Sequence, residues 1–137
     1  MTIIVTDEGF SADTWDKGFT PMGDAANDVE ALDVPSDIDP DTIPLTSEII
    51  RVDFPSFADG RGFTIARMLR LRGYKGRLRA RGHVLADQYA MARRTGFDEV
   101  EISQALAARQ PADQWAFRAD WKAHDYQNRL RGGQVAG

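Results

Sequence analysis

The chain has 137 residues, of which 42% are hydrophobic, a formal net charge of −4 and no cysteine. This length and composition predict one ordinary soluble domain. The lack of cysteine excludes disulfides, thiolate nucleophiles and cysteine ligands for zinc or an iron–sulfur cluster. The sequence has no apolar run long enough to span a membrane and no secretory signal pattern, so we expect a cytoplasmic protein with no membrane partner. We predict no bound cofactor.

Charge is distributed unevenly along the chain. Residues 1–59 carry 14 Asp and Glu against Lys17 and Arg51, whereas residues 61–97 carry ten Lys and Arg against Asp87. Such an asymmetry fits intramolecular pairing or solvated charge. A nucleic-acid surface is disfavoured because the chain is acidic overall and its basic block lacks interleaved aromatic residues. We therefore expect no nucleic-acid partner.

Residues 1–47 are predicted to form a loop-rich acidic segment. Within it, residues 2–5 could form a short strand. Residues 9–41 are rich in Asp, Gly and Pro and have weak periodicity, which is typical of loops. We expect this segment to wrap around the surface.

Residues 48–102 are predicted to form a βαβαβ core. The pattern predicts strands over 48–54, 77–81 and 98–102, and helices over 62–72 and 84–95. Gly73 followed by Tyr74 predicts a left-handed helix C-cap with an apolar contact. Ser103 is a predicted N-cap for the first of the C-terminal helices, which we place within residues 103–131. Residues 132–137 are expected to fray.

Side chains alternate between two chemically different faces in the three core strands. One face carries Ile50, Val52, Phe54, Leu78, Ala80, Val100 and Ile102. The other carries Arg51, Asp53, Arg77, Arg79, Arg81, Glu99 and Glu101. A parallel strand covered by helices on both sides would be apolar on both.

We therefore expect an α/β fold in which a short parallel sheet follows sequence order, with the arginine strand in the middle and the helices mainly on one face. The charged face is then a solvated ladder, a surface covered by the acidic N-terminal segment, or an anion site or partner surface. Because such a sheet has a small core, we also expect help from the N-terminal segment or from a second copy in a homodimer.

Ligands of open parallel sheets bind beyond the carboxyl ends of the strands. Here those ends precede helix starts, whose free amide groups favour an anion such as phosphate, sulfite or a carboxylate. The candidate anion-binding residues are Gly60, Arg61, Gly62, Arg79, Arg81, Asp87 and Gln88. The candidate catalytic residues are His83 and Asp59, although a histidine at a helix start is more often a cap or a solvent-facing side chain than a catalytic base. The turn at residues 59–62 lacks a full dinucleotide or P-loop pattern, and the two distant histidines predict no metal site.

An ordered series of short motifs resembles an uncharacterised bacterial family of the domain of unknown function 934 type. The motifs are residues 57–64, 66–67, 69–70, 73–80, 82–88 and 94–98, and the resemblance spans residues 48–102. Genes of that family commonly lie beside sulfite or nitrite reductase genes, and its members are often labelled probable oxidoreductases involved in sulfite reduction. The resemblance implies an accessory role in assimilatory sulfite reduction, with the sulfite/nitrite reductase as partner. It implies no assigned catalytic residues.

Two positions depart from the family pattern, since Arg77 stands where many relatives carry glutamate and Thr64 where serine is usual. The residues also leave two other functions open. One is a small enzyme or binding subunit that holds an oxyanion or nucleotide at the strand ends. The other is a structural interaction protein that docks through its charged sheet face.

Overall fold

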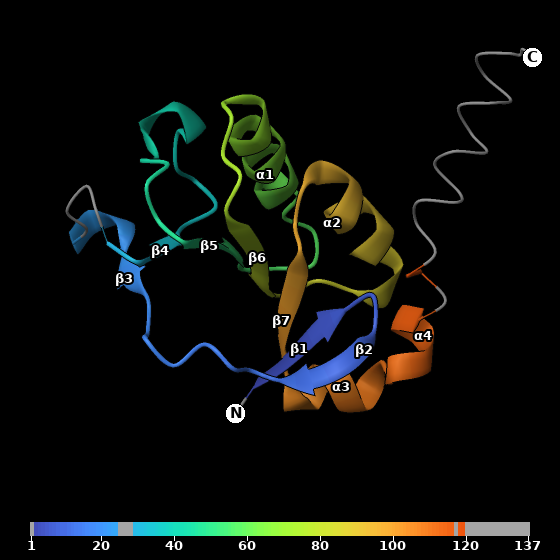
Figure 1. Ribbon diagram of the computed structural model, residues 1–137. Coiled ribbons are helices and arrows are strands. Elements are labelled where there is room, and N and C mark those ends of the chain that lie inside the picture. The colour runs from blue at the N-terminus through green and yellow to red at the C-terminus, as the bar shows by residue number, and fades with distance from the viewer. Residues whose placement is uncertain (1, 25–28, 117, 120–137) are drawn as a thin grey trace, which may run out of the picture.

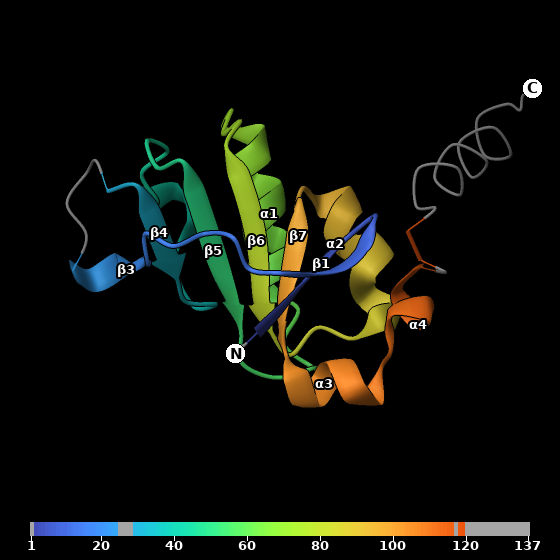
Figure 2. The ribbon, with the colours of Figure 1, turned by 60° about the horizontal axis from the view of Figure 1, so that its bottom comes forward.

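One mixed sheet runs through the computed structural model, which describes residues 2–24, 29–116 and 118–119 (Figures 1 and 2). Within these residues the sheet has seven strands in the order β2-β1-β7-β6-β5-β4-β3. The strands are β1 (Thr2–Thr6), β2 (Gly9–Ala12), β3 (Thr20–Pro21), β4 (Ala31–Val34), β5 (Ile49–Phe54), β6 (Arg77–Gly82) and β7 (Glu99–Ser103). Strands β3 to β7 are parallel, whereas β1 is antiparallel to both β2 and β7. The predicted α/β class and the central place of the arginine strand, β6, are confirmed.

Two helices cover one face of the central strands, as Figures 1 and 2 show. The helices of the described residues are α1 (Arg61–Leu71), α2 (Tyr89–Thr95), α3 (Gln104–Arg109) and α4 (Ala112–Ala116). Strands β5, β6 and β7 lie side by side in chain order. Right-handed crossover connections between them therefore place α1 and α2 on the same face of the sheet. The short helices α3 and α4 follow β7, and α4 contacts β2. The predicted C-terminal region beyond residue 119, including the tail, lies outside the described residues.

The core lies between this helical layer and the apolar face of the sheet. The predicted apolar strand residues are all buried, together with Phe63, Ala66 and Leu69 of α1 and Ala92 of α2. The ring of Phe54 lies 4.9 Å from that of Phe63 and 5.8 Å from that of Phe97, measured between ring centroids. Phe54 at the end of β5 therefore joins the sheet to both helical units.

The N-terminal segment contains more regular structure than the sequence predicted. The strand at residues 2–5 is confirmed as β1, but residues 9–41, expected to be loop, contribute β2, β3 and β4. These strands are only two to four residues long, too short for alternation to be recognised. β2 pairs as a hairpin with β1, whereas β4 depends on a later segment, as Leu32 lies beside Ile50 of β5.

The helix boundaries follow local backbone chemistry. Gly73 has a φ of 97° and the Tyr74 amide donates to the Leu69 carbonyl, which confirms the predicted C-cap. Ser103 is confirmed as an N-cap, because its Oγ accepts from the Leu106 amide at 3.1 Å. The helix predicted over 84–95 begins later, since a 3-10 turn, Ala86–Gln88, precedes α2.

Residues 13–19, here called the strap, cover the middle of the charged face of the sheet. Figure 2 shows this segment crossing the sheet between β2 and β3. Asp13 accepts two hydrogen bonds from the Arg79 guanidinium, both at 3.0 Å. The Phe19 ring lies 3.8 Å from the guanidinium carbon of Arg51 and 5.6 Å from that of Arg79. Coverage by the N-terminal segment, one of the three interpretations of this face, is therefore observed around Arg51 and Arg79, whereas Asp53 and Arg81 stay partly exposed.

Candidate functional site

Two depressions meet at the carboxyl ends of the parallel strands. One, of about 510 Å³, lies at the ends of β3, β4 and β5, and the other, of about 210 Å³, lies at the ends of β5, β6 and β7. Asp53 and Arg81 line both, so the two form one strand-end groove. Its first half is walled by Pro21, Met22, Val34, Pro35 and Ile38, and its second half by Thr2, His83, Glu101 and Ser103 among others.

Arg81 is a loosely held cation at the centre of the groove. The register of β6 places it between Asp53 of β5 and Glu101 of β7. Its Nη1 lies 3.5 Å from Asp53 Oδ1 and its Nε lies 3.7 Å from Glu101 Oε2, and 47% of its side chain is exposed. Charge-assisted N–H···O bonds are usually about 2.7–2.9 Å long. Arg81 can therefore form stronger contacts with an anion than those it makes in this structure.

Glu101 depends little on Arg81 for charge compensation. Its Oε1 is 3.1 Å from Nη1 of Arg51 and 2.9 Å from Nη1 of Arg79, and the side chain is buried. Asp53, with 39% of its side chain exposed, is the other carboxylate beside Arg81. A ligand anion that draws Arg81 away would leave Glu101 paired and Asp53 partly solvated.

His83 enters the groove immediately after β6. Its Nδ1 lies 3.2 Å from the carbonyl oxygen of Phe54. A carbonyl oxygen only accepts, so in the neutral imidazole Nδ1 carries the proton and Nε2 carries the lone pair. Gly82 makes this placement possible, because its φ is 113° and a Cβ there would lie 2.7 Å from the same carbonyl oxygen. His83 can thus accept a proton through Nε2.

Asp59 and Arg61 do not join this groove. Arg61 lines a separate depression of about 260 Å³ with Ser36 and other residues. Its Nη2 lies 2.8 Å from Asp59 Oδ2 and 3.1 Å from Ser36 Oγ. The hydrogen bonds that Arg61 donates hold the pKa of the Asp59 carboxyl well below its usual range. A carboxylate in that state is a weak base, which does not suit the predicted proton-transfer role of Asp59.

Arg79 was expected to be available to an anion, and its surroundings correct that expectation. Its side chain is fully buried and donates four hydrogen bonds to the carboxylates of Asp13, Glu99 and Glu101. Burial opposes the charge, but these carboxylates raise the pKa of Arg79 above its ordinary value. The strap and β7 supply acids to four of its five N–H donors, and the side chain is buried, so Arg79 stabilises the fold and is not a groove residue.

The remaining predicted anion-binding residues have structural roles or lie outside the groove. Gly60 is the N-cap of α1, and Gly62 is buried against Phe54. Gln88 accepts from the Leu85 amide at 2.9 Å and donates to the Phe57 carbonyl, so it fixes the turn before α2. Asp87 is 78% exposed and pairs with Arg118. Of the predicted site, Arg81 and His83 are therefore the side chains that meet in the groove.

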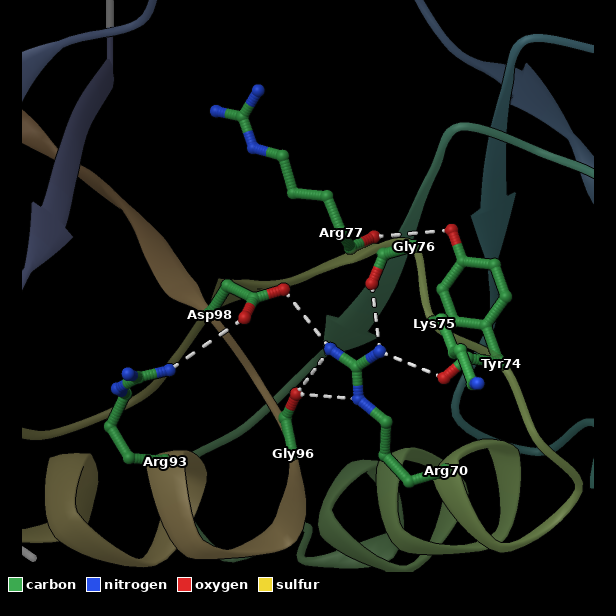
Figure 3. Close-up of a pocket in the computed structure, with 8 residues that line it drawn as sticks. All are labelled: Arg70, Tyr74, Lys75, Gly76, Arg77, Arg93, Gly96 and Asp98. Atoms are coloured by element: carbon green, nitrogen blue, oxygen red, sulfur yellow. Dashed lines mark hydrogen bonds and ion pairs between the residues drawn. The ribbon is translucent and has the colours of Figure 1, made fainter.

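A larger depression, of about 670 Å³, lies at the opposite end of the strands and surrounds Arg70 (Figure 3). Arg70 donates to the carbonyl oxygens of Tyr74, Gly76 and Gly96 and to Asp98. These are five hydrogen bonds, as many as a guanidinium has N–H donors. Arg70 therefore ties the ends of α1 and α2 to β6, and it has no donor left for a ligand.

Comparison with known families agrees with the motif series. A family model described as "Bacterial protein of unknown function (DUF934)" matches residues 28–135. The chain belongs to this family. No curated protein and no solved structure gave a significant match. None of the helices in the described part of this DUF934 chain has the length and apolar character needed to span a bilayer.

Some of the residues that line the groove of this DUF934 chain were not predicted from the sequence. Thr2 lies in the groove because β1 pairs with β7 so that Thr2 is beside Ser103. Met22 and Ile38 enter it from segments expected to be loop. No local pattern signals these positions, since each depends on pairing between distant parts of the chain. Thr2 and Met22 also lie outside the residues that match the family model.

Proposed function

We propose that this DUF934 protein is a cytoplasmic accessory of assimilatory sulfite reduction that binds a small oxyanion at Arg81. The link to sulfite reduction, with the sulfite/nitrite reductase as partner, rests on the family resemblance described above. The binding site rests on geometry. The observation that carries it is Arg81, a half-exposed cation at the carboxyl ends of three parallel strands, whose carboxylate contacts are 3.5 and 3.7 Å long.

The chemistry of an oxyanion suits this position. A guanidinium presents N–H donors in a planar fork that matches two oxygens of sulfite, sulfate or phosphate. His83 and Ser103 line the same half of the groove and can add donors from an imidazolium or a hydroxyl. Arg81 would exchange two long contacts for shorter ones, while Glu101 keeps its bonds from Arg51 and Arg79.

A thermal-shift measurement with sulfite, sulfate and phosphate tests the site. A ligand at one hundred times its Kd stabilises the folded state by about 2.7 kcal/mol, so Tm should rise with concentration. Arg81→Ala should abolish the rise and change unliganded stability by less than about 1 kcal/mol. Arg67→Ala, which removes an exposed arginine from α1, is the matched control and should keep the rise.

The proposal fails if no oxyanion shifts Tm, or if Arg81→Ala responds like the control.

The role in sulfite reduction is tested separately in the native host. A strain lacking the protein should grow poorly on sulfate as its sulfur source and normally on cysteine, and the reductase should copurify with the tagged protein. Equal growth on both sources would contradict that role without bearing on the oxyanion site. A homodimer stays a prediction.

A second function, a small enzyme that uses His83 as a base, is favoured by one observation. The Phe54 carbonyl fixes the tautomer that leaves the His83 Nε2 lone pair available. His83→Gln should then remove reductase-linked turnover while the oxyanion still raises Tm. Unchanged turnover in His83→Gln would show that His83 has a structural role and not a catalytic one. Docking through the charged sheet face has no such support, because the strap covers the middle of that face and Arg79 there is fully buried.

A further inference from the structure

The strand-end groove has two chemically different halves that meet at Asp53 and Arg81. The larger half encloses about 510 Å³ and its wall includes the side chains of Met22, Val34 and Ile38. Pockets that bind small organic ligands usually measure about 300–1,000 Å³ and are mostly apolar with a few polar groups. An inorganic oxyanion at Arg81 would leave this half unfilled.

The charges around the apolar half restrict the ligand further. Asp33 lines it, but its carboxylate already accepts from Arg51 at 2.6 and 2.8 Å. Asp53 at the junction is 39% exposed and lies 3.5 Å from Arg81. Because an ionised carboxylate only accepts hydrogen bonds, a ligand that reaches Arg81 past Asp53 should carry donors next to its anionic group.

We infer that the groove binds a nucleoside monophosphate. Its phosphate contacts Arg81, its ribose hydroxyls donate to Asp53, and its base lies in the apolar half against Met22 and Ile38. A thioether packs favourably against an aromatic ring, and the flat base matches an apolar wall. This inference rests on the proposed function, because both place the anion at Arg81.

Calorimetric titration of the full chain with AMP, ribose 5-phosphate and inorganic phosphate tests the inference. AMP should bind at least about tenfold more tightly than phosphate, with ribose 5-phosphate between them, because each additional part of the ligand fills more of the groove. Equal affinities for AMP and phosphate would overturn the inference and leave the oxyanion site standing. If AMP, phosphate and sulfite all fail to bind, both proposals fall.

A pair of methionine substitutions assigns the base to the apolar half. Met22→Gln keeps the side-chain length but adds an amide, and it should weaken AMP binding about five- to tenfold while phosphate affinity stays unchanged. The retained phosphate affinity also shows that the variant is folded. Met91→Gln makes the same change at a side chain of α2 that is 48% exposed, and it should alter neither affinity. Unchanged AMP affinity in folded Met22→Gln would overturn the inference.

Discussion

Arg79 and Arg81 lie two residues apart on the same face of β6 and have different surroundings. The strap and β7 enclose Arg79 with carboxylates, and its side chain is fully buried. Arg81 lies beyond the strap at the strand end, with 47% of its side chain exposed and longer contacts. A single strand therefore supplies one arginine to the fold and one to the groove.

This difference predicts unequal stability costs. Arg79→Met should lower the free energy of unfolding by about 3–5 kcal/mol, because it removes the buried cation that Glu99 and Glu101 share and leaves each with a single arginine. Arg81→Met, the matched control, should cost less than about 1 kcal/mol since its ion pairs are partly exposed. Urea unfolding measures both. Equal costs would contradict the assignment of Arg79 to the fold.

At the scale of elements, the start of α1 is fixed by a close contact with β5. Gly62 in the first turn of α1 faces the Phe54 ring, and a Cβ at this position would overlap the ring atom Cζ. Phe54 in turn packs against Phe63 and Phe97. The ring is held between two other aromatic rings, so the glycine sets how closely the helix approaches the sheet.

We expect Gly62→Ala to destabilise the protein by about 1–3 kcal/mol, the usual cost of overpacking a core. Alanine has the higher helix propensity by about 1 kcal/mol, so propensity alone predicts the opposite sign. Thr64→Ala, at an exposed position of the same helix, should be neutral or slightly stabilising. Thermal melts of both variants decide between packing and propensity, and a stabilised Gly62→Ala would show that Phe54 can move aside.

The elements that the sequence predicted well are those with long, regular patterns. The alternation in β5, β6 and β7 predicted their order and the side that α1 and α2 cover, because each strand has a full apolar face. Strands β2, β3 and β4 were not predicted, since their two to four residues are too few to show alternation, and β3 and β4 also depend on pairing with later segments.

The residues of the candidate site also divide into those that the sequence predicted and those that it did not. Arg81 and His83 follow directly from the end of β6. The apolar half of the groove does not, because Met22 and Ile38 reach it through β3 and β4, which the sequence did not reveal. The burial of Arg79 was missed for a similar reason, since Asp13 lies 66 residues away in the chain.

At the scale of the whole molecule, the acidic N-terminal segment and the basic middle of the sequence neutralise each other within one chain. Asp13 pairs with Arg79, Asp53 with Arg81, and Arg93 contacts Asp7. The uneven charge pattern is thus an internal complementarity, one of the interpretations that the sequence left open.

Acid should weaken the attachment of the strap. Burial acts to raise the pKa of Asp13, but hydrogen bonds from Arg79 and the Trp15 amide lower it below the ordinary value of 3.8. A carboxyl with a lowered folded-state pKa stabilises the protein above its unfolded pKa of about 3.9, and this contribution is lost as pH falls through the folded value. Asp13→Asn should therefore reduce stability at pH 7 and lose less on acidification below about pH 4.

Urea midpoints between about pH 7 and pH 2 measure this effect. The control is Asp16→Asn, an exposed position of the same strap, which should follow the wild-type curve. A parallel curve for Asp13→Asn, displaced but with unchanged pH dependence, would show that other carboxylates account for the acid response.

The pairing of β1 with β7 has a consequence for biosynthesis. Val5 lies beside Val100, so β1, the first of the seven described strands, pairs with β7, the last of them. At about 5–20 residues per second, the ribosome delivers β7 roughly 5–20 seconds after β1. During that interval the apolar residues Ile4 and Val5 have no β7 beside them, and closing so long a loop is slow compared with forming the local βα units. The nascent chain can therefore complete this sheet only after β7 has been translated, and Ile4 and Val5 of β1 stay without that partner until then.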